Sequence, residues 1–192
     1  MTIMLEQYKQ IIRSLLDEKR CYHSECVAKA ARELAVKYGA DPEKAETAGI
    51  LHDIMKDIPP EKQLAMMAKY GITLTPVERN APKLWHAMLG AAYLKNELNI
   101  DDKEILDAVR YHTTGRANMT LMDKVLFIAD FISADRDYPG VEDLRKAAAV
   151  SLEEAMVAGF SYTIADLAQA RKPIHPDTIS AYNETALGHD TK

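Results

Sequence analysis

Hydrophobic residues recur at steps of three and four along almost the whole chain, which is the spacing of one face of an α-helix. The first two faces consist of Leu5, Tyr8, Ile12, Leu15 and Leu16, and of Val27, Ala30, Ala31, Leu34 and Tyr38. No segment shows the convincing alternation of apolar and polar residues that is typical of a half-buried strand. The pattern therefore predicts an all-α protein.

Glycine and proline divide the chain between these helices. Gly39 suits the end of the second helix. Asp41 and Pro42 suit the N-cap and first position of a third helix that runs through His52, and Pro59-Pro60 interrupts the chain. Further helices are expected over 61–70, 82–97, 102–112, 120–134, 141–158, 161–171 and 177–186. We expect a compact bundle of about eight to ten helices.

Composition and charge narrow the class of protein. The 192 residues, 47% of them hydrophobic, fit one domain with a real core. A net charge of −5 argues against nucleic acid or an anionic membrane as the main partner, but not against a small anionic substrate. Cys21 and Cys26 would not face each other on a helix, and no apolar run reaches the length of a membrane span. The expected location is the cytoplasm.

Six residues with metal-ligand chemistry stand on the inner faces of these helices. They are His23, His52, Asp53, His86, His112 and Asp130. Any one of them could be an ordinary hydrogen-bonded core residue. Burying several unpaired ionisable groups together would be costly, whereas a shared cation would satisfy all of them. The sequence therefore predicts a metal site.

The order of these residues, with His52 and Asp53 adjacent, resembles the HD-domain superfamily of metal-dependent phosphohydrolases. The segments "RCYHSECVAKAA", "AGILHDIMKD", "WHAMLGA", "YHTTGRANMTLMDKVLFIADFI", "RDYPGVEDLR" and "IHPDTISAYN" further resemble the bacterial YqeK-type proteins, which are symmetrical diadenosine tetraphosphate hydrolases. One departure lies in Ser133-Ala134-Asp135-Arg136, where that family usually has a Glu-Pro step before the arginine. The departure leaves the 133–138 loop and the role of Arg136 open.

The resemblance implies a single HD domain over 1–192. Its metal-site core would span about 18–140, followed by a C-terminal helical extension over about 141–187 and a polar tail at 188–192. It also implies two divalent metal ions. One would be held by His23, His52, Asp53 and Asp130, and the other by His86 and His112, with Asp53 bridging and acting as a catalytic residue. Imidazole and carboxylate ligands suit iron, which we expect first, or manganese or zinc. A metal-bound hydroxide would attack phosphorus.

Several polar residues are candidates for holding the substrate. Lys56 lies one turn beyond His52, so it could contact phosphate or the leaving group, or it could be an exposed lysine. Arg20, Arg116 and Arg136 are candidate phosphate ligands that could equally be solvated. Thr113 and Thr114 could donate to phosphate or cap a turn, and His175 could contact the substrate or be structural.

The expected function is symmetrical hydrolysis of diadenosine tetraphosphate into two ADP. A nucleotide phosphomonoesterase and a non-hydrolytic nucleotide-binding sensor are the alternatives. The partner would be a nucleotide or dinucleotide. The apolar C-terminal helices are compatible with a homodimer, for which the sequence indicates no interface. Metal identity, base preference and oligomeric state stay open.

Overall fold

The structure is a computed structural model, and it describes residues 3–189. These residues form eleven α-helices, one 3₁₀ turn (η1) and no strand, as the hydrophobic pattern predicts. The elements are α1 (Ile3–Leu15), α2 (Glu18–Tyr38), α3 (Pro42–Leu51), α4 (Pro60–Lys69), α5 (Pro76–Arg79), η1 (Pro82–Leu84), α6 (Trp85–Glu97), α7 (Lys103–Tyr111), α8 (Leu121–Ile132), α9 (Val141–Val150), α10 (Leu152–Gln169) and α11 (Pro176–His189). The helix that sequence reasoning did not expect is the short α5.

Local capping explains where the helices begin and end. The Asp17 carboxylate accepts a hydrogen bond from the Arg20 backbone and so starts α2. Gly39 ends α2 at a φ of 84°, a left-handed conformation that glycine adopts without strain. Thr120 and Asp123 form a reciprocal capping box at the start of α8.

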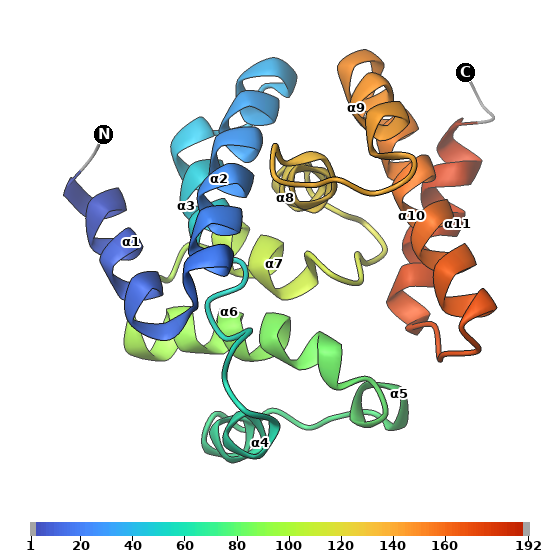
Figure 1. Cartoon of the computed structure of the whole chain (residues 1–192). Coiled ribbons are helices and arrows are strands. Elements are labelled where there is room, and N and C mark those ends of the chain that lie inside the picture. The colour runs from blue at the N-terminus through green and yellow to red at the C-terminus, as the bar shows by residue number, and fades with distance from the viewer. Residues whose placement is uncertain (1–2, 190–192) are drawn as a thin grey trace.

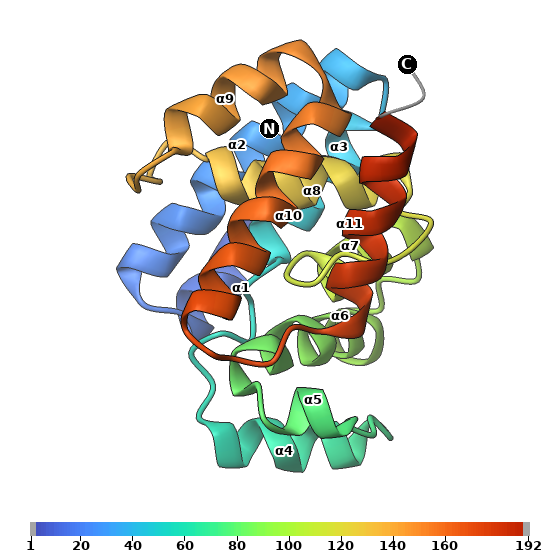
Figure 2. The same ribbon diagram turned by 90° about the vertical axis from the view of Figure 1, so that its right-hand side faces the viewer.

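The helices are arranged around α8, which lies in the middle of the array (Figure 1). Helices α2, α3 and α7 pack on one side of it, and α9 and α10 on the other. Helix α11 packs along α10, and α4 lies beneath α6 (Figure 2). The core passes through α8, where the Phe127 ring packs on that of Phe160 from α10 at a centroid distance of 4.6 Å.

Helices α2 and α3 approach each other closely at Gly49 of α3. A Cβ atom added there would lie 2.5 Å from the Ala28 Cα of α2, so only glycine fits. This approach matters for the site, because α2 carries His23 and α3 leads into His52.

The expected helix boundary near residues 158–161 is wrong. The structure has α9 end at Val150 and α10 run unbroken from Leu152 to Gln169. Ser151 makes the break by accepting a hydrogen bond from the Glu154 backbone as the N-cap of α10. Gly159 does not break the helix. A Cβ atom there would meet the Phe127 ring at 3.4 Å, an ordinary contact distance.

The remaining expectations concern termini, cysteines and membranes. Helix α11 continues through His189, so the expected polar tail begins inside a helix, and its last residues, 190–192, lie outside the described part. Cys21 and Cys26 are free thiols. Within residues 3–189, no helix is long and apolar enough to cross a membrane.

Candidate metal centre

His52 and Asp53 lie at the end of α3, where the chain leaves the helix through a series of turns. His52 Nδ1 lies 2.7 Å from the Gly49 carbonyl oxygen, to which it donates. This contact leaves Nε2 as the ring atom with a free lone pair. Nε2 is fully buried and has no hydrogen-bond partner in the described residues. A buried acceptor without a donor is the expected state of a ligand atom aimed at a cation.

Two further histidines are held in the same way. His112, which caps the end of α7, donates from Nδ1 to the Val109 carbonyl at 2.8 Å. His23 of α2 donates from Nδ1 to Asp135 Oδ2 at 2.8 Å. In each ring Nδ1 is engaged by an oxygen, so Nε2 faces the centre. Fixing the ring through its second nitrogen is the usual support of a metal-binding histidine.

The remaining ligand candidates complete a chain of acceptor atoms. His86 Nε2 lies 3.0 Å from Asp53 Oδ1 and 3.2 Å from His112 Nε2. On the other side, His23 Nε2 lies 3.0 Å from Asp130 Oδ1. Neighbouring ligand atoms around one ion are separated by about 3 Å when each bond is about 2.0–2.2 Å. The spacing therefore fits shared cations.

Two overlapping groups could each hold an ion. One consists of His23, His52 and Asp130, and the other of His52, Asp53 and His112, with all ligand atoms in a group within 4.8 Å. His86 belongs to neither group but contacts Asp53 and His112, so all six residues that the sequence singles out come together. Five elements supply them: α2, the end of α3, α6, the end of α7 and α8.

The pKa shifts of four of these groups favour the states that bind cations. Burial lowers the pKa of His52 and of His86 to about 4, so both are neutral near pH 7. Burial acts to raise the pKa of Asp53, but His52, His112 and His86 hold it well below its usual range. The pKa of Asp130 is likewise lowered, because His23 and His52 outweigh its burial. The carboxylates are therefore charged.

Three of the predicted cations surround this centre. Lys56 Nζ lies 3.3 Å from Asp53 Oδ1 and 3.1 Å from His86 Nε2, so it already contacts two ligand candidates. Arg20 pairs with Asp57, and one of its nitrogens lies 3.7 Å from Asp53 Oδ2. Arg136 pairs with Asp130. With His23, they line a cavity of about 320 Å³.

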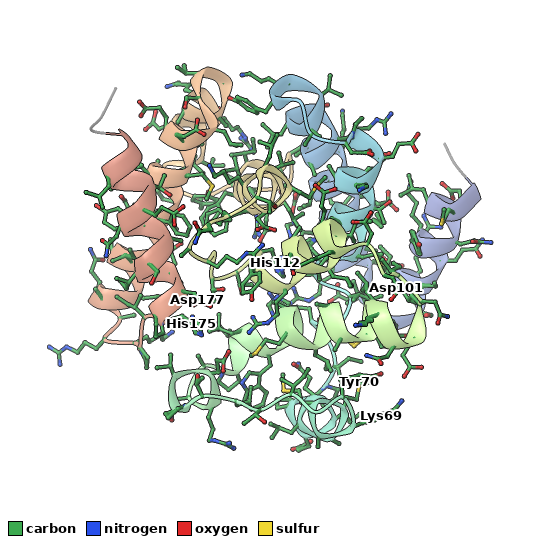
Figure 3. All side chains as sticks on the ribbon, turned by 180° about the vertical axis from the view of Figure 1, so that it is seen from behind. Lys69, Tyr70, Asp101, His112, His175 and Asp177 are labelled. Atoms are coloured by element: carbon green, nitrogen blue, oxygen red, sulfur yellow. The ribbon has the colours of Figure 1, made fainter. Side chains whose placement is uncertain are left out.

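Thr113, Thr114 and His175 come together in a second cavity, of about 440 Å³, which Lys56 also lines. The Thr113 hydroxyl is buried and has no hydrogen-bond partner in the described residues. The Thr114 carbonyl accepts from the Thr178 hydroxyl at 2.8 Å, which ties α11 to the turn after His112. His175 lies at the start of α11, on the side of the molecule seen in Figure 3.

Arg116 is placed differently from the other candidates. Its guanidinium donates to Asp123 at 2.7 Å and to Asp107 at 3.0 Å, and it stacks over the Tyr111 ring. The Asp123 side chain is fully buried. Among the described residues, its guanidinium therefore contacts these structural partners and none of the six ligand candidates.

Asp135 is a functional candidate that sequence reasoning did not assign. Besides accepting from His23, it accepts from the Ser133 hydroxyl at 2.7 Å, and both residues belong to the loop that departs from the family pattern. Arg145 of α9 holds this loop by donating to the carbonyls of Ser133 at 2.8 Å and Arg136 at 3.0 Å. In the sequence, Asp135 is a single carboxylate in a loop, and a loop position does not indicate which histidine the carboxylate contacts.

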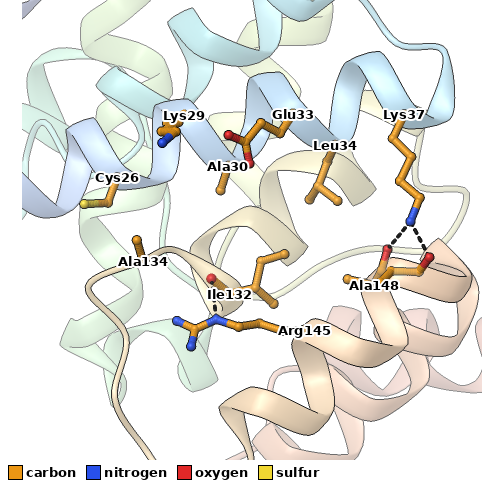
Figure 4. A pocket seen from close by; sticks show the side chains of 11 residues that line it. Cys26, Lys29, Ala30, Glu33, Leu34, Lys37, Ile132, Ala134, Arg145 and Ala148 are labelled. Atoms are coloured by element: carbon orange, nitrogen blue, oxygen red, sulfur yellow. Dashed lines mark hydrogen bonds between the residues drawn. The ribbon is translucent and has the colours of Figure 1, made fainter.

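A further cavity, of about 540 Å³, lies between α2 and α9, away from this chemistry (Figure 4). Its lining includes Cys26, Lys29, Glu33 and Arg145, and none of the six ligand candidates. Lys37 bridges its end by donating to the Ala148 carbonyl at 3.2 Å. This cavity borders Arg145, which holds the 133–138 loop, and it is not part of the candidate metal centre.

The fold and the centre together define an all-helical protein with a buried histidine–aspartate site able to hold divalent metal. The model of the HD domain family matches residues 20–135, which include all six ligand candidates. The chain belongs to the HD domain family.

Relatives resemble the chain over nearly its full length. A Bacillus subtilis protein named symmetrical bis(5′-nucleosyl)-tetraphosphatase is 39% identical over 95% of this chain and 98% of its own. A protein of the same name from Staphylococcus aureus is 36% identical over 93% of both chains. A solved structure from Clostridium acetobutylicum, described as a predicted HD superfamily hydrolase involved in NAD metabolism, is 36% identical. It superposes with a TM-score of 0.91 over 94% of this chain and 96% of its own.

Proposed function

We propose that this protein splits diadenosine tetraphosphate symmetrically into two ADP, as the names of its relatives indicate for them. The observation that carries the proposal is the coincidence of two features. Six ligand-type side chains converge on one buried centre, and Arg20, Lys56 and Arg136 line the cavity beside it. A tetraphosphate bridge is a polyanion that needs both metal ions and fixed cations.

We assign the ligands of two divalent ions as the family resemblance implies. His23, His52, Asp53 and Asp130 would hold one ion, and His86 and His112 the other, with Asp53 shared. The unpartnered Nε2 of His52 and the 3.0 Å approach of His86 to Asp53 support this division. Iron is our first expectation, with manganese or zinc as alternatives. When bound, the ions would polarise phosphoryl oxygens and activate water as a nucleophile.

The chain's own cations would orient the polyphosphate. Lys56 lies against Asp53 and His86, so its ammonium would meet a phosphate oxygen at the centre itself and offset the charge of the departing ADP. Arg20 would contact the phosphates from α2 and Arg136 from the loop after α8. Both keep an aspartate partner, which limits how far each guanidinium can turn.

One nucleoside would lie in the cavity lined by Thr113, Thr114 and His175. Lys56 borders that cavity as well as the central one, so a phosphate chain can pass from one to the other beside it. The unpartnered Thr113 hydroxyl is available to donate to a ligand there. A phosphate contact from Arg116 is the weakest part of the assignment, because its guanidinium is already paired with two aspartates.

The test is product analysis on the purified protein with its metal content recorded. Diadenosine tetraphosphate should give ADP as the sole product, while AMP, ADP and ATP stay intact. Phosphate release from mononucleotides alone would instead make the protein a nucleotide phosphomonoesterase. Nucleotide binding without turnover would make it a sensor.

A pair of variants connects the activity to the centre. Asp53→Ala removes the shared ligand and should abolish most metal binding and nearly all hydrolysis. Asp101→Ala removes an exposed carboxylate at the α6–α7 turn, which Figure 3 labels, and should leave both unchanged. Full metal content and rate in Asp53→Ala would refute the site.

The undivided domain over 1–192, the homodimer and the cytoplasmic location stay predictions.

A further inference from the structure

Three cavities near the candidate centre share lining residues. The central one, of about 320 Å³, contains Arg20, His23, Asp53, Lys56 and Arg136. It shares Lys56 with the cavity that contains His175. It shares Arg136 with a third cavity, of about 270 Å³. Each of the two other cavities thus shares a cation with the central one, which suits a ligand with negative charge in its middle and a neutral group at each end.

Aromatic rings form the third cavity, which we call the aromatic cavity. It is lined by Phe131, Tyr138 and Tyr162 together with Asp130 and Arg136. The Tyr138 and Tyr162 rings are 5.2 Å apart and tilted by 41°, and the Phe131 ring meets Tyr162 edge-on at 6.4 Å. The Tyr138 hydroxyl donates to the Phe131 carbonyl at 3.0 Å, which fixes the Tyr138 ring.

Tyr162 is the accessible member of this group. It is 43% exposed, and its hydroxyl has no hydrogen-bond partner among the residues that the structure describes. A single exposed tyrosine on a helix is ordinary. Here, however, the ring borders a cavity that also contains a guanidinium and a candidate metal ligand. Exposed ring faces beside a phosphate-binding cation are the elements from which nucleotide sites are built.

We infer that the aromatic cavity receives the second nucleoside of the dinucleoside polyphosphate, with its base stacked on Tyr162 and its adjoining phosphate at Arg136. The inference rests on the proposed function. The size agrees, because a cavity of about 270 Å³ is smaller than the ~300–1,000 Å³ of sites that enclose a whole ligand. It suits one end of a longer molecule. A one-ended nucleotide seated in the His175 cavity would leave the aromatic cavity empty.

The experiment compares a two-ended with a one-ended substrate. Diadenosine tetraphosphate and adenosine 5′-tetraphosphate carry the same number of phosphates but differ by one nucleoside. In the wild type, the two-ended substrate should have the lower KM. Tyr162→Ala should raise that KM by about 5- to 150-fold, the effect of losing one base stack, and should leave the KM of the one-ended substrate unchanged.

Tyr162→Phe is the matched control, because it keeps the ring and removes only the unpartnered hydroxyl. It should retain the wild-type ratio of the two KM values. Thermal melting of each variant reports on folding, and a substitution at a 43% exposed side chain should change it little.

The outcomes separate the two proposals. If the wild type, Tyr162→Ala and Tyr162→Phe all split the dinucleotide with the same ratio of the two KM values, the inference about the aromatic cavity is wrong and the proposed function stands. An equal loss for both substrates in Tyr162→Ala also overturns it, since that would be a general structural effect. No splitting of the dinucleotide by the wild type overturns the proposed function and the second nucleoside site with it. A loss confined to the two-ended substrate, restored by phenylalanine, establishes the site.

Discussion

Replacing Gly49 by alanine should loosen the contact on which the metal centre is built. The added Cβ atom would lie 2.5 Å from the Ala28 Cα and 2.8 Å from its nitrogen, both of them backbone atoms that cannot rotate away. Helices α2 and α3 would have to separate by about 1 Å to reach an ordinary contact distance. His23 and His52, which these helices position, would separate with them.

The magnitude follows from two opposing effects. Overpacking against backbone belongs at the upper end of its usual cost, about 3 kcal/mol. Alanine is the better helix former and returns about 1 kcal/mol. The net loss of about 2 kcal/mol lowers the melting temperature by about 4–8 °C for a chain of this size.

Two measurements check this reasoning. Melting of the metal-free protein, followed by circular dichroism, gives the stability, and titration against a chelator of known affinity gives metal binding, which should weaken in parallel. Gly188→Ala is the control, because a Cβ atom in that last turn of α11 has nothing within 4 Å and should cost nothing. A Gly49→Ala protein that melts at or above the wild type would refute the packing argument.

Three further predictions concern single polar contacts. Asp135→Ala should weaken metal binding by about 10- to 100-fold, because His23 loses its acceptor, and Asp135→Asn should restore most of it in the same titration. Asp123→Ala should destabilise by about 1–3 kcal/mol in urea unfolding, because the α8 capping box and one of the two aspartate partners of Arg116 are lost. Burial acts to raise the pKa of Glu78, but the Thr75 backbone and hydroxyl hold it below its usual 4.5. Its stabilisation is therefore present above that pH and lost as pH falls, so Glu78→Gln and wild type should converge in urea unfolding as the pH falls below 4.5.

Sequence reasoning located the centre because each ligand candidate sits on a helix whose inner face the apolar residues already mark. His112, for example, follows the face of Ile105 and Val109, and the structure buries all three. Hydrophobic periodicity predicts which side chains of a helix point toward the core. For the six ligand candidates, this was enough to predict that they lie close together.

The loop contacts could not be obtained in this way. Asp135 lies beyond the end of α8, where no periodicity constrains its direction, and it reaches His23 only because Arg145 holds the loop by its carbonyls. The helix break at Ser151 could have been predicted from the sequence, because serine followed by glutamate three residues later is a helix-start signal. The expected gap between helices near residues 158–161 does not exist, because α10 runs unbroken from Leu152 to Gln169.

The tie between the turn after His112 and α11 also bears on how such a protein could be shortened or fused. The family pattern ends at residue 135, yet Arg145 and Thr178, both beyond it, hold the loop of Asp135 and the carbonyl of Thr114 in place. A chain cut at the end of the matched residues would keep every ligand candidate and lose two of the contacts that hold the neighbouring loop and turn in place. The transplantable unit therefore extends through the segment from Arg136 to Thr178, and an engineer joining it to another enzyme should place the junction after α11.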